Sequence, residues 1–262
     1  MATKRLGPGR TADFMDYRCE RERMPRSSGV EFWLRRHVVK FVPEPILNQV
    51  RAYRRSDAFR EAGVVMIHVP RAAGTSLSTE LYGRFIGHFS VTELLAVAPT
   101  DVAALPRFAV VRNPWDRLVS AWSFARRGFS LVEPGGSSST GDAARIRIRR
   151  EEQYQVPEFE SFERFVHEWL MLRDVHLLDG VFRPQVDYVR DPEGAMPLDF
   201  LGRFERLDQL AAWLAETAGR QFDLPRLNAS ERGAYRSHYT PELARLVGEI
   251  YAKDIAAFGY EF

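Results

Sequence analysis

The chain of 262 residues is poor in cysteine, lysine and long apolar runs. Its one cysteine, Cys19, cannot form an intrachain disulfide, and neither thiolates nor acidic clusters predict a metal site. No segment approaches the roughly 18 consecutive apolar residues of a membrane span, and the N-terminus has no apolar signal core, so we expect a cytoplasmic protein. A formal net charge of +2 argues against generic nucleic-acid binding.

The overall composition of the chain is typical of a globular protein. With 45% hydrophobic residues the chain can bury a sizeable core. Residues 1–45, rich in Arg, Gly, Pro and Ser, predict a partly flexible arm, and residues 46–262 a single domain. A Gly- and Ser-rich stretch predicts a mobile insertion near 133–150. The basic alternation at 145–150 inside it either faces solvent or contacts an acidic partner.

One stretch has the pattern of a strand, a tight turn and a helix start. Val64–Val69 is mostly aliphatic, small residues follow, and the hydroxyls of Thr75 and Ser76 lead into an apolar pattern with helical spacing. Such a turn points backbone N–H groups and the positive end of a helix dipole at one place, which suits a phosphate or sulfate. Arg71 adds a permanent charge. The loop differs from the nucleotide-triphosphatase loop, which needs a leading Gly and a Lys.

A second stretch repeats this pattern. Phe108–Val111 predicts a buried strand, Asn113 a helix N-cap and Pro114 the first helical residue. Arg112 then lies at the carboxyl end of the strand, and Ser120 lies about two turns into the helix. A guanidinium and a hydroxyl placed in this way could hold a second phosphate.

Later segments predict the remaining core. Leu198–Phe204 has the pattern of a short strand and Leu207–Thr217 that of its helix. Phe159–Leu172 and Glu242–Phe258 have helical spacing, the second as a closing amphipathic helix. Strands that alternate with helices predict an α/β fold with a parallel sheet covered by helices on both faces.

The two loop stretches together resemble the sulfotransferase superfamily. Pro70–Ser76 is similar to its 5′-phosphosulfate loop, and Arg112–Ser120 to its 3′-phosphate element. Segments at 182–189, 201–207, 227–232 and 239–260 resemble the branch that contains carbohydrate sulfotransferases. The resemblance covers about residues 62–262 and implies a three-layer, P-loop-NTPase-like sulfotransferase fold.

The resemblance also implies a sulfate donor, 3′-phosphoadenosine 5′-phosphosulfate (PAPS), and a set of residues that bind it. Arg71 would additionally stabilise charge on the departing phosphate, although relatives more often carry Lys there. The expected donor-binding residues are Arg71, Ala72, Ala73, Gly74, Thr75, Ser76, Arg112, Ser120 and Arg232.

The resemblance makes His88 the candidate catalytic base, because relatives carry a Gly-His segment after the loop and imidazole titrates near neutrality. Glu80 and Glu93 are alternative bases, His68 is a weaker one, and His176 is expected near the acceptor. The acceptor is expected to be a carbohydrate or glycolipid hydroxyl.

Three alternatives remain open at this point. Protein-tyrosine sulfotransferases, as a group, also carry Arg at the loop position of Arg71, which would make the acceptor a peptide. A nucleotide kinase would need magnesium and a triphosphate. A non-catalytic nucleotide-binding relative would bind the donor without transfer. The sequence predicts no oligomeric state.

Overall fold

The computed structural model describes residues 42–127, 154–219, 221–222 and 234–262. All of these residues except Val42 belong to one compact unit, Pro43–Phe262. Most of the predicted arm and the predicted insertion near 133–150 lie outside the described residues. Within the described part, no helix combines the length and the apolar character needed to cross a membrane.

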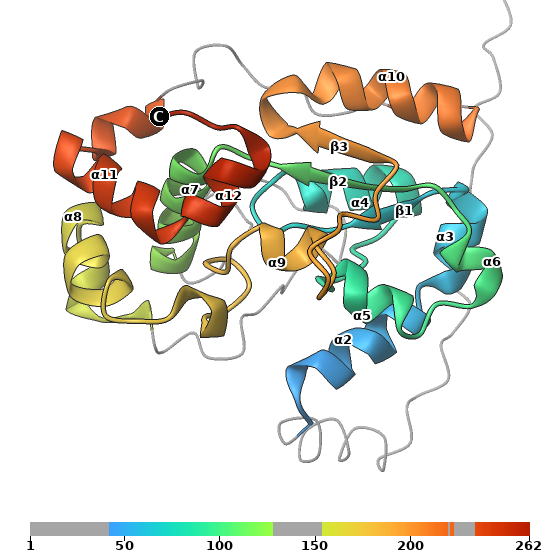
Figure 1. Ribbon diagram of the computed structural model, residues 1–262, viewed down its shortest axis with the longest axis horizontal. Coiled ribbons are helices and arrows are strands. Elements are labelled where there is room, and N and C mark those ends of the chain that lie inside the picture. Colours follow the sequence, from blue (N-terminus) through green and yellow to red (C-terminus); the bar gives the residue numbers. More distant parts are fainter. Residues whose placement is uncertain (1–41, 128–153, 220, 223–233) are drawn as a thin grey trace, which may run out of the picture. The chain divides into compact units, whose positions relative to one another are not determined.

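The centre of the described part is a parallel sheet with the order β1-β2-β3 (Figure 1). Its strands are β1 (Val65–Ile67), β2 (Arg107–Val111) and β3 (Phe200–Arg203). Met66 pairs with Phe108, and Ala109 pairs with Leu201. Because the three strands are parallel, the loops that follow them meet at one edge of the sheet. The predicted parallel α/β sheet is confirmed.

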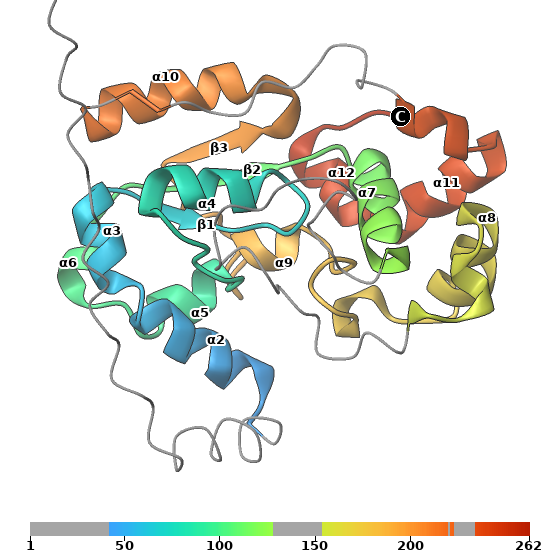
Figure 2. The ribbon, with the colours of Figure 1, turned by 180° about the vertical axis from the view of Figure 1, so that it is seen from behind.

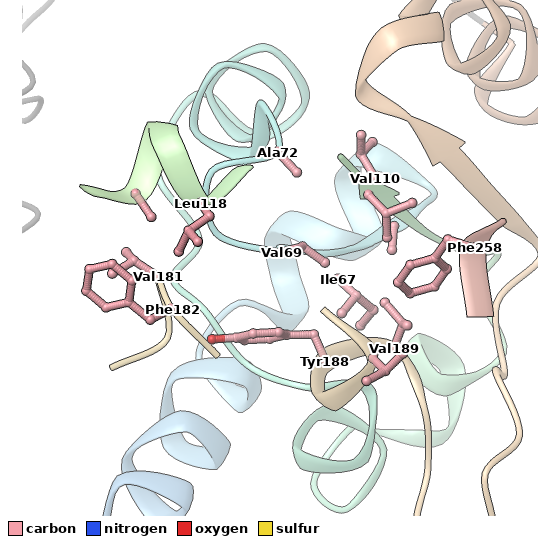
Figure 3. Close-up of a cluster of buried hydrophobic side chains, with 14 of the residues drawn as sticks. Ile67, Val69, Ala72, Val110, Leu118, Val181, Phe182, Tyr188, Val189 and Phe258 are labelled. Atoms are coloured by element: carbon pink, nitrogen blue, oxygen red, sulfur yellow. The ribbon is translucent and has the colours of Figure 1, made fainter. Parts of the chain in front are cut away.

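Helices cover both faces of this sheet. Figure 2 shows α4 (Gly74–Tyr82) across one face, and Figure 1 shows α9 (Val186–Val189) and α12 (Ala252–Phe258) on the opposite face. Ile67 and Val110 of the sheet pack with Val189 and Phe258 in the core shown in Figure 3. The predicted three-layer arrangement is therefore confirmed.

The remaining α-helices surround these layers. The helix α10 (Leu207–Ala218) runs along β3 and begins four residues after the strand ends, at the residue that the sequence predicts. The bounds of the remaining α-helices are α2 (Glu44–Tyr53), α3 (Ser56–Ala62), α5 (Val91–Leu95), α6 (Thr100–Ala103), α7 (Pro114–Arg126), α8 (Phe162–Arg164), α10 (Leu207–Ala218) and α11 (Pro241–Ile250).

Two helix predictions need correction. The closing helix predicted over Glu242–Phe258 is two helices, α11 and α12, separated at Tyr251, whose hydroxyl is held by the Phe182 carbonyl at 2.7 Å. The helix predicted over Phe159–Leu172 begins as the short α8 and continues as a π-helix, Phe165–Leu170. In both segments, packing of buried aromatic side chains overrides the regular α-helical pattern.

Candidate functional site

The turn between β1 and α4 has the geometry of an anion-binding loop. Arg71 and Ala73 adopt left-handed backbone conformations, with φ of 67° and 64°, which are uncommon outside glycine and concentrate at functional sites. Gly74 begins α4, and a Cβ there would lie 1.9 Å from Cδ2 of His68. Only glycine therefore lets the helix start against the His68 ring, with its free N–H groups toward the loop.

This arrangement corrects the predicted place of His68. β1 ends at Ile67, so His68 lies just beyond the strand and not within it. Its ring is 2% exposed and packs on the start of α4 at Gly74. The side chain of Ala72 is 1% exposed and lies among the buried side chains shown in Figure 3.

Arg71 joins the two stretches that the sequence singled out. Its guanidinium donates from Nε and Nη2 to Oγ of Ser120 at 3.2 and 3.0 Å, and it lies 4.4 Å from the ring centroid of Phe124. Desolvation, together with the nearby charges of Arg112, Arg127 and Arg117, lowers the pKa of Arg71 to about 10. The side chain therefore stays charged at neutral pH, in surroundings that favour an anion.

Arg112 lies at the carboxyl end of β2, as predicted, and its surroundings orient the guanidinium. Nε and Nη2 each donate to a carboxylate oxygen of Asp116 at 2.8 Å, and Nη1 donates to the Arg71 carbonyl at 3.2 Å. The group also lies 4.1 Å from the Phe204 ring centroid. Asn113 caps α7 through the N–H groups of Trp115 and Asp116, which confirms the predicted helix start.

The buried side chain of Gln185 holds the backbone of Arg112, and the buried carboxylate of Asp254 holds the backbone of Gln185. Oε1 of Gln185 accepts the Arg112 N–H at 2.9 Å, and its Nε2 donates to the Arg112 carbonyl at 2.8 Å. Asp254 in turn accepts the N–H groups of Gln185 and Val186, both at 2.9 Å, while burial raises its pKa. Sequence reasoning gave neither side chain a role, because their partners lie about 70 residues away.

Arg117 is a buried cation that links the loop to a distant segment. It is 2% exposed, and its guanidinium donates to the carbonyls of Pro70 (2.9 Å), Gly180 (3.3 Å) and Arg183 (2.9 Å). A buried guanidinium stays stable when its donors are satisfied in this way. Arg117 thus places residues 180–183 beside the anion loop.

His88 lies next to the same loop and is partly exposed. Its Nδ1 lies 3.2 Å from the His68 carbonyl, and the two imidazole centroids are 4.2 Å apart. Desolvation and the charges of Arg51, Arg117 and Arg71 lower the pKa of His88 to about 4, against a smaller opposing effect of the backbone hydrogen bond. His88 is therefore neutral at pH 7.

One cleft of about 600 Å³ brings most of these side chains together. That volume lies in the range usual for small-ligand sites. On one side it is lined by the anion loop, and on the other by residues that sequence reasoning missed, in α2 and near residue 180. The α2 residues at positions 44, 48 and 51 have the spacing of one helix face, a pattern that could have been recognised in the sequence. The lining includes Arg71, Ala73, Gly74, Thr75, Ser76, His88, Arg112, Phe124, Asp179, Arg183, Tyr188, Phe204, Glu44, Asn48 and Arg51.

Other predicted residues lie apart from this cleft. Glu80 is exposed on α4, and Glu93 is engaged in the capping box of α5, so neither lines it. His176 contacts Asp187, with Nδ1 at 2.7 Å from the carboxylate, and does not line it either. Arg232 lies outside the described residues.

A parallel α/β sheet whose strands end at an anion loop, with arginines and hydroxyls around one cleft, defines a class of proteins that bind phosphorylated nucleotides. Within that class, residues 98–261 match the Sulfotransferase family, and the match covers more than half of the chain. The chain therefore belongs to the sulfotransferase family, and it is an enzyme that takes its sulfate group from PAPS. It matches no curated protein and no solved structure.

The residues present fit this donor. At the loop the cleft offers the guanidinium groups of Arg71 and Arg112, the hydroxyls of Thr75 and Ser76, and a glycine that leaves room at the helix start, which suits a ligand with several anionic groups. The family match includes Arg112 and Ser120 but begins after the anion loop and His88. The geometry at the loop and at His88 is therefore an observation independent of that match.

Proposed function

We propose that the enzyme transfers the sulfuryl group of PAPS to a hydroxyl of a carbohydrate or glycolipid, with His88 as the general base. One observation supports this proposal above the others. His88, anchored on the His68 carbonyl, lines the same cleft as the anion loop and Arg112. A base, a positively charged loop and room for an acceptor are what in-line transfer needs.

On the donor side, Arg71 and the N–H groups from Ala72 to Ser76 would hold the 5′-phosphosulfate. Arg112 and Ser120 would hold the 3′-phosphate, and the same role remains predicted for Arg232. The donor supplies the sulfuryl group when bound. Arg71 would neutralise charge on the 5′-phosphate as its bond to sulfur breaks, an electrostatic role that needs no metal clamp in this proposal.

The tautomer of His88 supports its role as base. A carbonyl oxygen can only accept, so the contact with His68 requires the proton on Nδ1 and leaves the lone pair on Nε2. Nε2 would take the acceptor's hydroxyl proton while the acceptor oxygen bonds to sulfur. Burial is the main cause of the low pKa of His88, and the nearby arginines lower it further; an anionic donor beside Arg71 would offset the part due to that charge and so strengthen the base.

The acceptor side of the cleft supports a polyhydroxyl acceptor. It carries two carboxylates, Glu44 and Asp179, and two guanidinium groups, Arg51 and Arg183. Together these can accept from and donate to sugar hydroxyls. Because this side carries as many carboxylates as guanidinium groups, it gives an acidic peptide no net attraction, and the protein-tyrosine alternative keeps only the support of Arg71. The kinase alternative has no support in a member of this family.

The test is transfer of labelled sulfate from PAPS to a panel of acceptors. The panel holds neutral oligosaccharides, uronate-containing polysaccharides, glycolipids and an acidic peptide with tyrosine. We expect labelled glycan or glycolipid, and about a 10²- to 10⁴-fold slower transfer by H88A, the usual contribution of a general base. H176A, a histidine outside the cleft, is the matched control. Label on the peptide alone would overturn the acceptor proposal, and full activity of H88A would overturn the base.

A further inference from the structure

Helix α2 presents a polar face to the cleft. Glu44, Asn48 and Arg51 follow one another at spacings of four and three residues and all line the cleft. Asn48 is 5% exposed, which is unusual for an amide side chain unless its groups are paired.

Asn48 is paired at both ends. Its Oδ1 accepts from Nη1 of Arg51 at 2.9 Å, and its Nδ2 donates to Oε1 of Glu93 at 3.0 Å. The other oxygen of Glu93 accepts the Ser90 N–H at 2.7 Å, and Oγ of Ser90 accepts the Glu93 N–H at 3.1 Å. Asn48 is thus connected, through a capping box, to a backbone N–H two residues beyond His88.

Two further contacts hold the same turn from the same side. Gly87 has a φ of 97°, which favours glycine, and a Cβ there would meet Cδ of Arg51 at 3.8 Å, so the arginine stem packs on the turn. Nε of Arg55, just after α2, donates to the Ile86 carbonyl at 3.3 Å. Residues 86–90, with His88 in their middle, are therefore held between α2 and α5.

We propose that Asn48 is a positioning residue for His88: it fixes the turn so that Nδ1 stays on the His68 carbonyl and Nε2 keeps its lone pair for the acceptor. The proposal rests on the proposed role of His88 as base. It goes beyond the packing of α2 on α5, because a leucine of similar volume would fill the same space without making either hydrogen bond.

The groups that face His88 make the effect measurable. They are Arg51 from α2, Arg71 from the anion loop, Arg117 from α7, and the carbonyl and ring of His68. Without Asn48, Arg51 loses its hydrogen bond to the Asn48 side chain, and the turn at residues 86–90 is no longer held at a fixed distance from His68. We therefore expect the Nδ1 hydrogen bond to become intermittent and the imidazole to sample both tautomers.

The experiment is nitrogen NMR of the histidine side chains in the full ¹⁵N-labelled chain, titrated with pH, with H88Q to assign the His88 signals. In the native protein we expect one tautomer, protonated on Nδ1, and a pKa well below the ordinary 6.5. In N48L we expect mixed tautomers and a lower pKa, because the hydrogen bond to the His68 carbonyl, which opposes the low pKa, becomes intermittent. V50A, on the exposed side of the same helix, should leave both unchanged.

A reversed pair gives the sharper test. N48D alone places two carboxylates together and should behave like N48L or worse. In the double variant N48D/E93Q the introduced amide can donate to the introduced carboxylate and still accept the Ser90 N–H, so the native tautomer should return. We expect 3′-phosphoadenosine 5′-phosphate (PAP) to stabilise N48L as it stabilises the native protein. This result would show that the donor side of the cleft is intact in the variant.

Each outcome decides the question. A native tautomer and pKa in N48L, or failure of the double variant to restore them, would overturn the positioning role. Loss of PAP stabilisation in N48L would also overturn it, because Asn48 would then support the whole cleft. The proposal that His88 is the general base has a separate test, because full sulfate transfer by H88A would refute it. That result would not change the tautomer measured in N48L.

Discussion

Gln185 offers a sharp test of how the donor site is held. Its side chain is 0% exposed and makes two hydrogen bonds to the backbone of Arg112. Q185M keeps the chain length and removes both bonds, so the N–H and the carbonyl of Arg112 lose their side-chain partner. Each unsatisfied buried group costs about 1–3 kcal/mol, and new methionine contacts offset part of this, so we expect a loss of about 2–4 kcal/mol in unfolding free energy.

The assay is urea unfolding with and without PAP. Because Arg112 should contact the 3′-phosphate, we also expect Q185M to bind PAP about tenfold or more weakly. Q209M makes the same substitution on the exposed side of α10 and should change the unfolding free energy by less than about 0.5 kcal/mol. A Q185M protein within that limit, with PAP affinity unchanged, would refute the assignment of Gln185 as the support of Arg112.

Three further outcomes are expected. G74A should abolish stabilisation by PAP in a thermal-shift assay, because the new Cβ would overlap the His68 ring; normal stabilisation would show that the loop start tolerates a side chain. R71K keeps the charge but loses the paired contact with Ser120, so we expect it to bind PAP about tenfold more weakly than the native protein, as measured by calorimetry. R71A should bind PAP more weakly still. Equal affinity of R71K and the native protein would contradict this expectation. The pKa of His88 is about 4 in the folded protein and near 6.5 in the unfolded chain, so its contribution to stability is present above about pH 6.5 and is lost as the pH falls toward 4. An H88Q protein should therefore lose less unfolding free energy than the native protein between pH 7 and pH 5. An equal loss in both proteins would count against the low pKa.

Local patterns were sufficient to predict the elements that carry the donor site. Aliphatic runs before small or capping residues identified β1 and β2, and Asn113 and Pro114 identified the start of α7. These signals depend on neighbours within a few residues, so they can be read without knowledge of the fold. The strand β3 and the helix after it follow the same rule.

Where long-range packing controlled the backbone, the same patterns were wrong. The break at Tyr251 depends on a hydrogen bond to residue 182, and the π-helix at Phe165–Leu170 lies among aromatic side chains from several segments. Helical spacing of apolar residues is the same in an α-helix of one piece and in one that is broken. It identified the buried residues and missed the shape of the backbone.

By itself the sequence determined the chemistry of the loop: a charge, hydroxyls and a helix start adjacent along the chain. Only the tertiary structure decided which groups meet there. Ser120 contacts Arg71 across 49 residues of sequence, and Arg117 reaches carbonyls 47 to 66 residues away. Such contacts arise because parallel strands bring their carboxyl ends to one edge. The place of α2 beside His88 depends in the same way on an amide, Asn48, whose partner Glu93 lies 45 residues further along.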